Sequence, residues 1–261
     1  MNGGAEMSRP INRTALVTGS SRGIGRAIAE RLGREGVLVA VHYARNEEAA
    51  EHTVKSIIAD GGRAFQVRAE FGVPGDVDTL LEGLRAGLEE LAEDVGLDIL
   101  VNNAAIITSG TALEGTTPEL FDRLMAVNAR APFFLTQRAL PLLRDGGRII
   151  NISSGLTRFA NPQEVAYAMS KAALEMIGLH FARYLGPRRI TVNTVSPGIT
   201  DTGHPSLLVP QIREALSNLA AFGRLAEPAD IADVVAFLAS DDARWITGSV
   251  IDASGGTMLG G

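Results

Sequence analysis

The stretch TALVTGSSRGIGRAIAERLGREG, residues 14–36, joins a short apolar run to a glycine-rich turn and a helical pattern. Residues 14–20 are apolar and rich in β-formers, which predicts a strand buried on both faces. Gly19, Gly23 and Gly25 stand where the chain leaves this strand and opens a helix. Gly36 then follows the helical pattern, as a glycine commonly follows a helix. A strand, a tight turn and a helix in this order are the first unit of a parallel α/β sheet.

The same alternation continues through most of the chain. Further strands are predicted over 37–43, 63–69, 97–103, 147–153, 190–196 and 248–256, with helical patterns over 23–36, 46–62 and 118–147. Strand–helix–strand units with short connections give parallel strands joined by right-handed crossovers. We therefore predict one doubly wound, Rossmann-type domain over 13–261 with about seven strands, after a disordered tail over 1–12. Residues 198–224 interrupt the alternation, and their mixture of turn formers and apolar residues predicts a substrate lid.

Composition excludes several classes of protein. The 261 residues are 46% hydrophobic and 21% charged, an ordinary globular balance with no cysteine for disulfides or thiolate metal sites. The four histidines lack metal-ligand spacing, so no metal is predicted. A net charge of −6 argues against nucleic-acid binding. Without a signal peptide or a long apolar run, the sequence predicts a cytoplasmic protein that does not enter membranes.

The glycine turn is a candidate phosphate site. Ligands of open α/β sheets bind at the carboxyl ends of the strands. Glycines there let the backbone approach a pyrophosphate, whose charge suits a helix N-terminus. The spacing is G-x-x-x-G-x-G rather than G-x-G-x-x-G, and a glycine turn alone also serves ordinary packing. There is no phosphate loop of the G-x-x-x-x-G-K-[ST] form, which disfavours an ATPase.

A serine, a tyrosine and a lysine in the stretch SGLTRFANPQEVAYAMSK, residues 154–171, suit carbonyl reduction. Lys171 lies four residues after Tyr167, so on a helix the two side chains share a face. A nearby cation favours the phenolate and lowers the pKa of a tyrosine from its usual ~10. Ser154 follows the fifth predicted strand and could bond a carbonyl oxygen on which charge develops. Taken alone, these residues also fit structural roles. Tyr167 and Lys171 could be an ordinary pair on a helix surface, and Ser154 could bond backbone groups at the end of a strand.

The whole pattern resembles the short-chain dehydrogenase/reductase family, and within it 3-ketoacyl-carrier-protein reductases and related antibiotic-pathway ketoreductases. The resemblance covers roughly residues 12–258. It rests on T-G-x-x-x-G-x-G at 18–25, N-N-A-A at 102–105, Asn128, Ser154, the Y-x-x-x-K of Tyr167 and Lys171, and Pro197-Gly198. Two positions depart from the family: Ala105 stands where a glycine is usual, and Glu70 where an aspartate often meets the adenine.

The resemblance implies the catalytic roles. Tyr167 would be the general acid, Ser154 would orient the carbonyl, and Lys171 would also hold the nicotinamide ribose. Asn128 would bind a water that relays protons to Lys171. The resemblance also implies a homotetramer.

The cofactor is predicted to be NADP(H). Where the strand at 37–43 ends, no carboxylate stands at His42, Tyr43 or Ala44, and Arg45 follows. Arg45 and Arg22 could bind a 2′-phosphate, whereas an acidic residue there would favour NAD. Both arginines also fit solvated surface positions. The predicted cofactor-binding residues are Gly19, Ser21, Arg22, Gly23, Ile24, Gly25, Tyr43, Ala44, Arg45, Glu70, Phe71, Asn103, Ala104, Ala105, Tyr167, Lys171, Pro197, Gly198, Thr200 and Thr202.

The predicted function is NADPH-dependent reduction of a largely apolar ketone. A β-ketoacyl thioester or a polyketide-like carbonyl would fit the apolar residues of the lid and of the loop after Ser154, which are Leu156, Phe159, Leu207, Leu208 and Ile212, with Arg158 and His204 as polar contacts. Arg183, Arg188 and Arg189 could dock an acidic carrier protein. Two alternatives stay open: an NAD(P)-dependent alcohol dehydrogenase working oxidatively, and a non-catalytic dinucleotide sensor.

Overall fold

A single parallel sheet forms the centre of the molecule. The computed structural model describes residues 13–108, 110–257 and 259, so the predicted tail over 1–12 lies outside the described residues. The seven strands run in the order β3-β2-β1-β4-β5-β6-β7, and every neighbouring pair is parallel. The predicted doubly wound fold is therefore confirmed. The strands are β1 (Thr14–Val17), β2 (Leu38–Tyr43), β3 (Arg63–Arg68), β4 (Leu97–Asn102), β5 (Leu143–Ile152), β6 (Thr191–Pro197) and β7 (Val250–Ala253).

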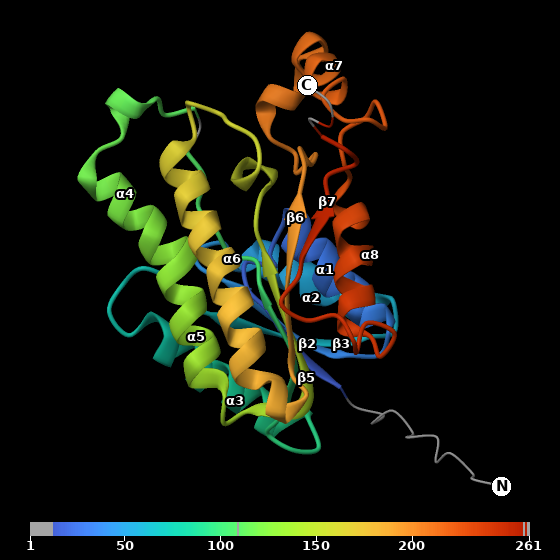
Figure 1. The fold of residues 1–261 in the computed structure, drawn as a ribbon. Helices are drawn as coiled ribbons and strands as arrows, with labels where there is room; N and C mark the ends of the chain where they lie inside the picture. Colours follow the sequence, from blue (N-terminus) through green and yellow to red (C-terminus); the bar gives the residue numbers. More distant parts are fainter. Residues whose placement is uncertain (1–12, 109, 258, 260–261) are drawn as a thin grey trace, which may run out of the picture.

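Helices cover both faces of this sheet, as Figure 1 shows. One core packs α3, α5 and α6 against the sheet, and a second core on the other face packs α1, α2 and α8 against it. The central strands β1, β2, β4 and β6 are buried along their whole length, whereas the edge strands β3 and β7 alternate. The helices are α1 (Gly23–Arg34), α2 (Glu47–Ala59), α3 (Asp76–Leu91), α4 (Pro118–Met125), α5 (Ala131–Ala139), α6 (Val165–Leu185), α7 (Pro210–Ser217) and α8 (Pro228–Ala239).

The strand order reverses between β1 and β4. The chain moves outward from β1 to β2 and β3, and then returns to the other side of β1 as β4. The connections after β1 and β4 consequently diverge at the carboxyl edge of the sheet. Open α/β sheets bind their ligands at such a point. The glycine turn at 19–25 and residues 103–106 both emerge there.

The long helical pattern predicted over 118–147 is not one helix. It consists of α4, a π-helical turn η2 (Ala126–Arg130) and α5, and the helix ends at Ala139. Strand β5 begins at Leu143, four residues before the predicted start, because Leu143 pairs with Leu97, the first residue of β4. The Gly-Gly at 146–147 therefore lies inside an irregular strand and does not end a helix.

The predicted lid leaves the sheet after β6. It carries a short 3-10 helix, η5 (Pro205–Leu208), and α7, which has no buried residue. Figure 1 shows this segment standing above the carboxyl end of β6, apart from the two layers of helices. Its base is pinned by a bridge between Thr200 and Ala226 and by a bond from Asp201 N to the Ala226 carbonyl. None of the described helices has the length and apolar character needed to cross a membrane.

Candidate active site

The glycine turn is closed by the segment that follows β4. Gly19 has a φ of +66°, and an added Cβ would come within 2.8 Å of the Ala104 Cα. A Cβ on Gly25 would collide with the Asn103 amide and the Gly19 carbonyl. The Asn103 side chain in turn donates to the carbonyls of Thr18 and Gly19. Both glycines are thus required because two backbone segments meet here without room for a side chain.

The turn leads into a helix start suited to an anion. Arg22 is the N-cap of α1, no side chain caps this end, and no acidic residue occupies the first turn. Helix N-termini carry unpaired N–H groups and a partial positive charge. These groups can bind a pyrophosphate, so the residues present fit a dinucleotide cofactor.

His42, a buried residue of β2, holds the glycine turn, a role that sequence reasoning missed. The Gly19 N–H donates to His42 Nδ1 over 2.9 Å, and His42 Nε2 lies 2.9 Å from the Ala69 carbonyl. Because Nδ1 accepts, the ring must be neutral with its proton on Nε2. Burial lowers the pKa of His42 to about 4, so this form persists at neutral pH. Its imidazole also packs against Phe71, with ring centroids 4.8 Å apart.

The buried histidine predicts a specific loss of stability in acid. The unfolded chain takes up a proton at the ordinary histidine pKa of 6.5, whereas the folded chain does so only near 4. The free energy of unfolding should therefore fall by about 3 kcal/mol as the pH drops from 6.5 to 4. Urea unfolding at successive pH values measures this slope.

His42→Asn should lose most of that slope, whereas His52→Asn, at an exposed position, should keep it. An unchanged slope in His42→Asn would show that another group causes the acid sensitivity.

Ser154, Tyr167 and Lys171 meet at the carboxyl end of β5. The Ser154 hydroxyl donates to the phenol oxygen of Tyr167, and Lys171 Nζ lies 5.9 Å from the centre of the tyrosine ring. Tyr167 and Lys171 stand one turn apart in α6, as their spacing predicted. The Lys171 ammonium donates to the Ile152 carbonyl over 2.8 Å and is 2% exposed. The structure thus brings together three of the four predicted catalytic residues in one contact group.

The pKa values of this group differ from the sequence expectation. Burial raises the pKa of Tyr167 to about 12, outweighing the Ser154 bond that lowers it, and the Glu164 carboxylate raises it further. The Lys171 ammonium bonds the Ile152 carbonyl rather than the phenol oxygen. Burial lowers the pKa of Lys171 itself to about 8. Tyr167 therefore holds its proton at neutral pH, which suits a proton donor.

Asn128 lies in the π-helical turn, which is a common location for functional residues. Its amide accepts from Ile106 N and donates to the Ile106 carbonyl, both over 2.9 Å. It also donates to the Ser170 hydroxyl over 3.0 Å. Asn128 is fully buried. Its side chain joins the segment after β4 to α6, so a water relay at this residue would use its backbone.

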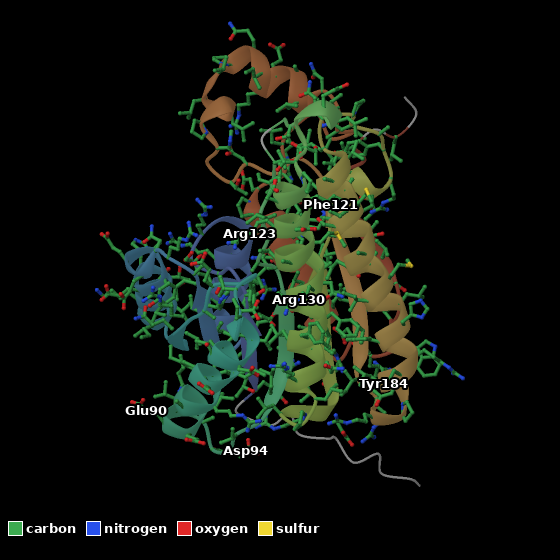
Figure 2. All side chains as sticks on the ribbon, turned by 90° about the vertical axis from the view of Figure 1, so that its left-hand side faces the viewer. Glu90, Asp94, Phe121, Arg123, Arg130 and Tyr184 are labelled. Atoms are coloured by element: carbon green, nitrogen blue, oxygen red, sulfur yellow. The ribbon has the colours of Figure 1, made fainter. Side chains whose placement is uncertain are left out.

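Arg45 and Glu70 form an exposed ion pair near the predicted adenosine site. Arg45 lies 2.6 Å from the Glu70 carboxylate, and Arg123 approaches the same oxygen to 3.2 Å. Both arginines lower the pKa of Glu70. In Figure 2, Arg123 is labelled on α4 and extends toward this region. Glu70 therefore lies where an adenine contact is predicted, but its carboxylate forms ion pairs with Arg45 and Arg123.

The remaining predicted cofactor residues line the same edge of the sheet. Tyr43 and Phe71 are buried at the ends of β2 and β3. Thr18 Oγ accepts from the backbone N–H of Asn103 and Ala104, which fixes the segment that ends at Ala105. A further group surrounds the glycine turn or follows β6, namely Ser21, Gly23, Ile24, Ala44, Pro197, Gly198, Thr200 and Thr202. Within it, a Cβ on Gly23 would lie 3.4 Å from the methyl group of Thr202, so the lid base contacts the turn.

A cavity of about 210 Å³ lies beside Ser154. It is lined by Gly155, Arg158, Phe159, Asp252, Ser254, Thr257 and Leu259. Arg158 is held there by Asp252 over 3.3 Å. Among the lid residues, Leu207 is buried whereas Leu208 and Ile212 are exposed. A larger cavity of about 450 Å³ between α1 and α8 opens at the amino ends of the strands, on the opposite edge from Tyr167.

The predicted carrier-docking arginines do not lie at this site. Arg183 is 16 positions after Tyr167 on α6, roughly 24 Å along the helix. Arg188 follows α6 and is bonded to Asp145 over 2.8 Å. Arg183, Arg188 and Arg189 are therefore at the far end of α6 from Tyr167. The described part of the chain contains no cluster of His, Cys, Asp or Glu side chains that could bind a metal ion.

The fold and the site define a dinucleotide-dependent oxidoreductase of the Rossmann class. The glycine turn, whose residues fit a phosphate, and the Ser–Tyr–Lys group lie at the same edge of a doubly wound sheet. A protein-family model described as Enoyl-(Acyl carrier protein) reductase matches residues 19–258. The chain belongs to the short-chain dehydrogenase/reductase family, as the sequence resemblance predicted.

Solved structures and a curated protein resemble this chain over nearly its whole length. The angucycline C-6 ketoreductase LanV with bound NADP is 65% identical, with a TM-score of 0.92, over 95% of this chain and 96% of LanV. A second LanV structure holds NADP and rabelomycin. The promiscuous reductase LugOII, which catalyses keto-reduction at C1 during lugdunomycin biosynthesis, is 60% identical with a TM-score of 0.93, over 95% of this chain and 98% of LugOII. Versicolorin reductase stcU of Emericella nidulans is 38% identical over 94% of this chain and 96% of its own.

Proposed function

We propose that this chain is an NADPH-dependent ketoreductase that reduces a ring carbonyl of a polycyclic aromatic polyketide. The predicted keto reduction and the predicted NADP(H) cofactor are confirmed by the 65% identity to LanV with bound NADP. The choice of a polycyclic substrate rests on the LanV structure that holds rabelomycin. A carrier-bound thioester is less well supported, because Arg183, Arg188 and Arg189 lie at the far end of α6 from Tyr167.

The chain's own residues would hold the cofactor in a defined place. The turn at 19–25 and the N-terminus of α1 would hold the pyrophosphate, Arg22 and Arg45 would hold the 2′-phosphate, and Lys171 would hold the nicotinamide ribose. In this place the cofactor would supply a hydride for the carbonyl carbon.

The protein supplies the proton and the geometry. Tyr167 donates its phenolic proton to the carbonyl oxygen as negative charge develops there. The Ser154 hydroxyl donates to the same oxygen and fixes the orientation of the ketone. Lys171 lies one turn from Tyr167 and stabilises the phenolate that remains. Asn128 holds α6 to the segment after β4, and its backbone places the water that returns a proton.

The segment 198–224 acts as the substrate lid in this proposal. Its helix α7 buries no residue, and Leu208 and Phe222 are 82% and 76% exposed. Exposed apolar side chains on such a segment suit closure over an aromatic ligand. Beyond its base, the segment is also held by backbone bonds from Ala221 and Phe222 to the carbonyls of Gly256 and Gly255. Binding a polycyclic substrate would cover these side chains and exclude water from Tyr167.

The proposed assembly is a homotetramer. Outer residues of α6 expose apolar side chains, with Met169, Met176 and Leu179 each about half exposed. Figure 2 shows Tyr184 on the same helix projecting outward, and this side chain is 73% exposed. Trp245, in the connection between α8 and β7, is 95% exposed. These exposed apolar side chains support contacts between copies of the chain. The cytoplasmic location stays a prediction of the sequence.

Removing Arg45 should weaken selection of NADPH. Arg45→Ala should raise the KM for NADPH on the order of 10-fold, because a charged hydrogen bond to the 2′-phosphate is lost. The KM for NADH, which lacks that phosphate, should change less than 2-fold. Steady-state kinetics with both cofactors measures the difference. Arg85→Ala, at an exposed position on α3, serves as the control. Equal changes for both cofactors would place Arg45 outside the 2′-phosphate site.

The function is tested by following NADPH absorbance with three ketones. Rabelomycin represents a polycyclic substrate, a β-ketoacyl thioester represents a carrier-type substrate, and a small cyclic diketone serves as a generic ketone. We expect turnover with NADPH and the highest kcat/KM for rabelomycin. Faster turnover of the thioester would contradict the proposed polycyclic substrate and favour a carrier-type substrate. Tight NADPH binding with no turnover of any ketone would favour the dinucleotide sensor, and efficient alcohol oxidation with NAD alone would favour the oxidative dehydrogenase.

A further inference from the structure

Three side chains on successive turns of α6 contact three consecutive residues at the end of β5. Lys171 donates to the Ile152 carbonyl, the Tyr167 phenol accepts from Ser154, and Glu175 accepts from Ser153. Positions 167, 171 and 175 are spaced by four, so they lie on one face of the helix. The proposed mechanism uses the first two of these contacts. The third contact belongs to the Glu175 carboxylate, which has no role in the proposed mechanism.

The Glu175 carboxylate fastens both ends of the loop that carries Ser154. Its Oε1 atom accepts from Ser153 Oγ over 2.6 Å and from Thr157 Oγ1 over 2.8 Å. Ser153 is 4% exposed and immediately precedes Ser154. Thr157 is the last residue of the short helical turn η3 (Gly155–Thr157), which follows Ser154. Hydrogen bonds to a charged acceptor are stronger than bonds between neutral groups.

The hydrogen bonds that Ser154 itself accepts are longer than those of Glu175. The Ser154 hydroxyl accepts from Leu156 N over 3.3 Å, and Thr157 N donates to the Ser154 carbonyl over 3.2 Å. Thr157 Oγ1 also lies 3.0 Å from the Ser154 carbonyl, but its single hydrogen cannot serve that oxygen and Glu175 fully at once. Near the loop, Arg158 is turned away toward Asp252. Glu175 is therefore the charged group of α6 that fixes this turn.

We propose that Glu175 is a positioning residue, which holds the Ser154 hydroxyl against the Tyr167 phenol through Ser153 and Thr157. This inference rests on the proposed roles of Ser154 and Tyr167. Glu175 does not touch the substrate or exchange a proton in this scheme. Its carboxylate keeps the loop in the geometry in which the single Ser154 hydroxyl hydrogen points to the phenol in the free enzyme and to the carbonyl oxygen once the ketone is bound.

The test compares Glu175→Met with Glu175→Gln. Methionine removes the acceptor at similar length, so Ser154 should lose its alignment and kcat should fall on the order of 10-fold, since small displacements of catalytic groups are costly. The KM for NADPH should stay within 2-fold. Glutamine keeps a carbonyl oxygen that accepts from both hydroxyls, and it should restore most of kcat.

A second readout separates positioning from a loss of general stability. The Ser154 bond lowers the pKa of Tyr167, so a displaced Ser154 should raise it. For alcohol oxidation, in which Tyr167 must be ionised, Glu175→Met should therefore move the rise in rate to higher pH. Thr157→Val should shift the profile in the same direction, and combining it with Glu175→Met should add little. Thr157→Val also serves if Glu175→Met fails to fold.

Two results would overturn the inference. One is a folded Glu175→Met enzyme with unchanged kcat and pH profile. The other is a lower kcat that glutamine does not restore and that comes without a shift in the profile. Tyr167→Phe separates this failure from failure of the proposed function: an active Tyr167→Phe enzyme refutes the proposed mechanism, whatever Glu175 does.

Discussion

Tyr167→Phe is expected to reduce kcat for ketone reduction by roughly 10²–10⁴-fold, the usual contribution of a positioned acid. The substitution removes only the hydroxyl group, so the ring remains to pack beside Lys171. In the chain itself the phenol has a pKa of about 12, which keeps it protonated across the whole range of a neutral assay. Loss of this proton donor should therefore reduce kcat at every pH below that value.

The measurement is single-turnover reduction followed by NADPH absorbance, together with the Kd for NADPH by fluorescence titration. The Kd should change less than 3-fold, because the pyrophosphate turn and the arginines are untouched. Tyr184→Phe provides a matched control, since that phenol is 73% exposed at the other end of α6. Retention of more than a tenth of kcat in Tyr167→Phe would assign the proton to another group.

Lys171→Met is expected to inactivate the enzyme and to stabilise the fold. Lys171 is 2% exposed, and burial alone accounts for the lowering of its pKa from 10.5 to about 8. A shift of this size means that the charged form costs about 3 kcal/mol in the folded chain at pH 7. Methionine removes that cost, although the bond to the Ile152 carbonyl is lost with it. Turnover should nevertheless fall by ~10²-fold or more, because the cation beside Tyr167 is gone.

The pH dependence of the free energy of unfolding tests this account of Lys171. Between pH 8 and 10.5 the unfolded chain binds more protons than the folded chain at this lysine, so wild-type stability should rise with pH in that window. Urea unfolding of Lys171→Met should show no such rise. The other lysine, Lys55, is exposed, and Lys55→Met should keep it. A destabilised Lys171→Met protein would mean that the ammonium is better compensated than these contacts indicate.

The fold was predictable because its signals are local and repeat along the chain. Buried strands such as 38–43 and 97–102 read as continuous apolar runs, and the glycine turn marks where β1 gives way to α1. The start of β5 was not predictable, because Leu143 becomes a strand residue only by pairing with Leu97, far away in the sequence. The π-helical turn in the long central helix was also missed, although Pro132 at the start of α5 marks its place by lacking the N–H of a regular helical bond.

The site was predictable where chemistry follows sequence spacing. Tyr167 and Lys171 share a helix face, so the spacing of four was informative. His42 carried no such signal, because its role depends on Gly19 and Ala69, which come from two other segments. Glu175 was hidden for a related reason: a glutamate on a helix reads as a solvated charge until the structure places Ser153 and Thr157 against it.

The π-helical turn at Ala126–Arg130 can be viewed as an insertion of one residue into an otherwise ordinary helix. Deleting Ala129 would restore regular winding while leaving every other side chain in the chain unchanged. That deletion would turn the segment before it by roughly 100° relative to α5, the angle that one residue contributes to a regular helix. Asn128 would then leave Ile106 and Ser170, although the helix itself would survive. If the sequence of a homologue lacks one residue at this turn, we consequently expect that homologue to keep the fold but to lose the position of Asn128.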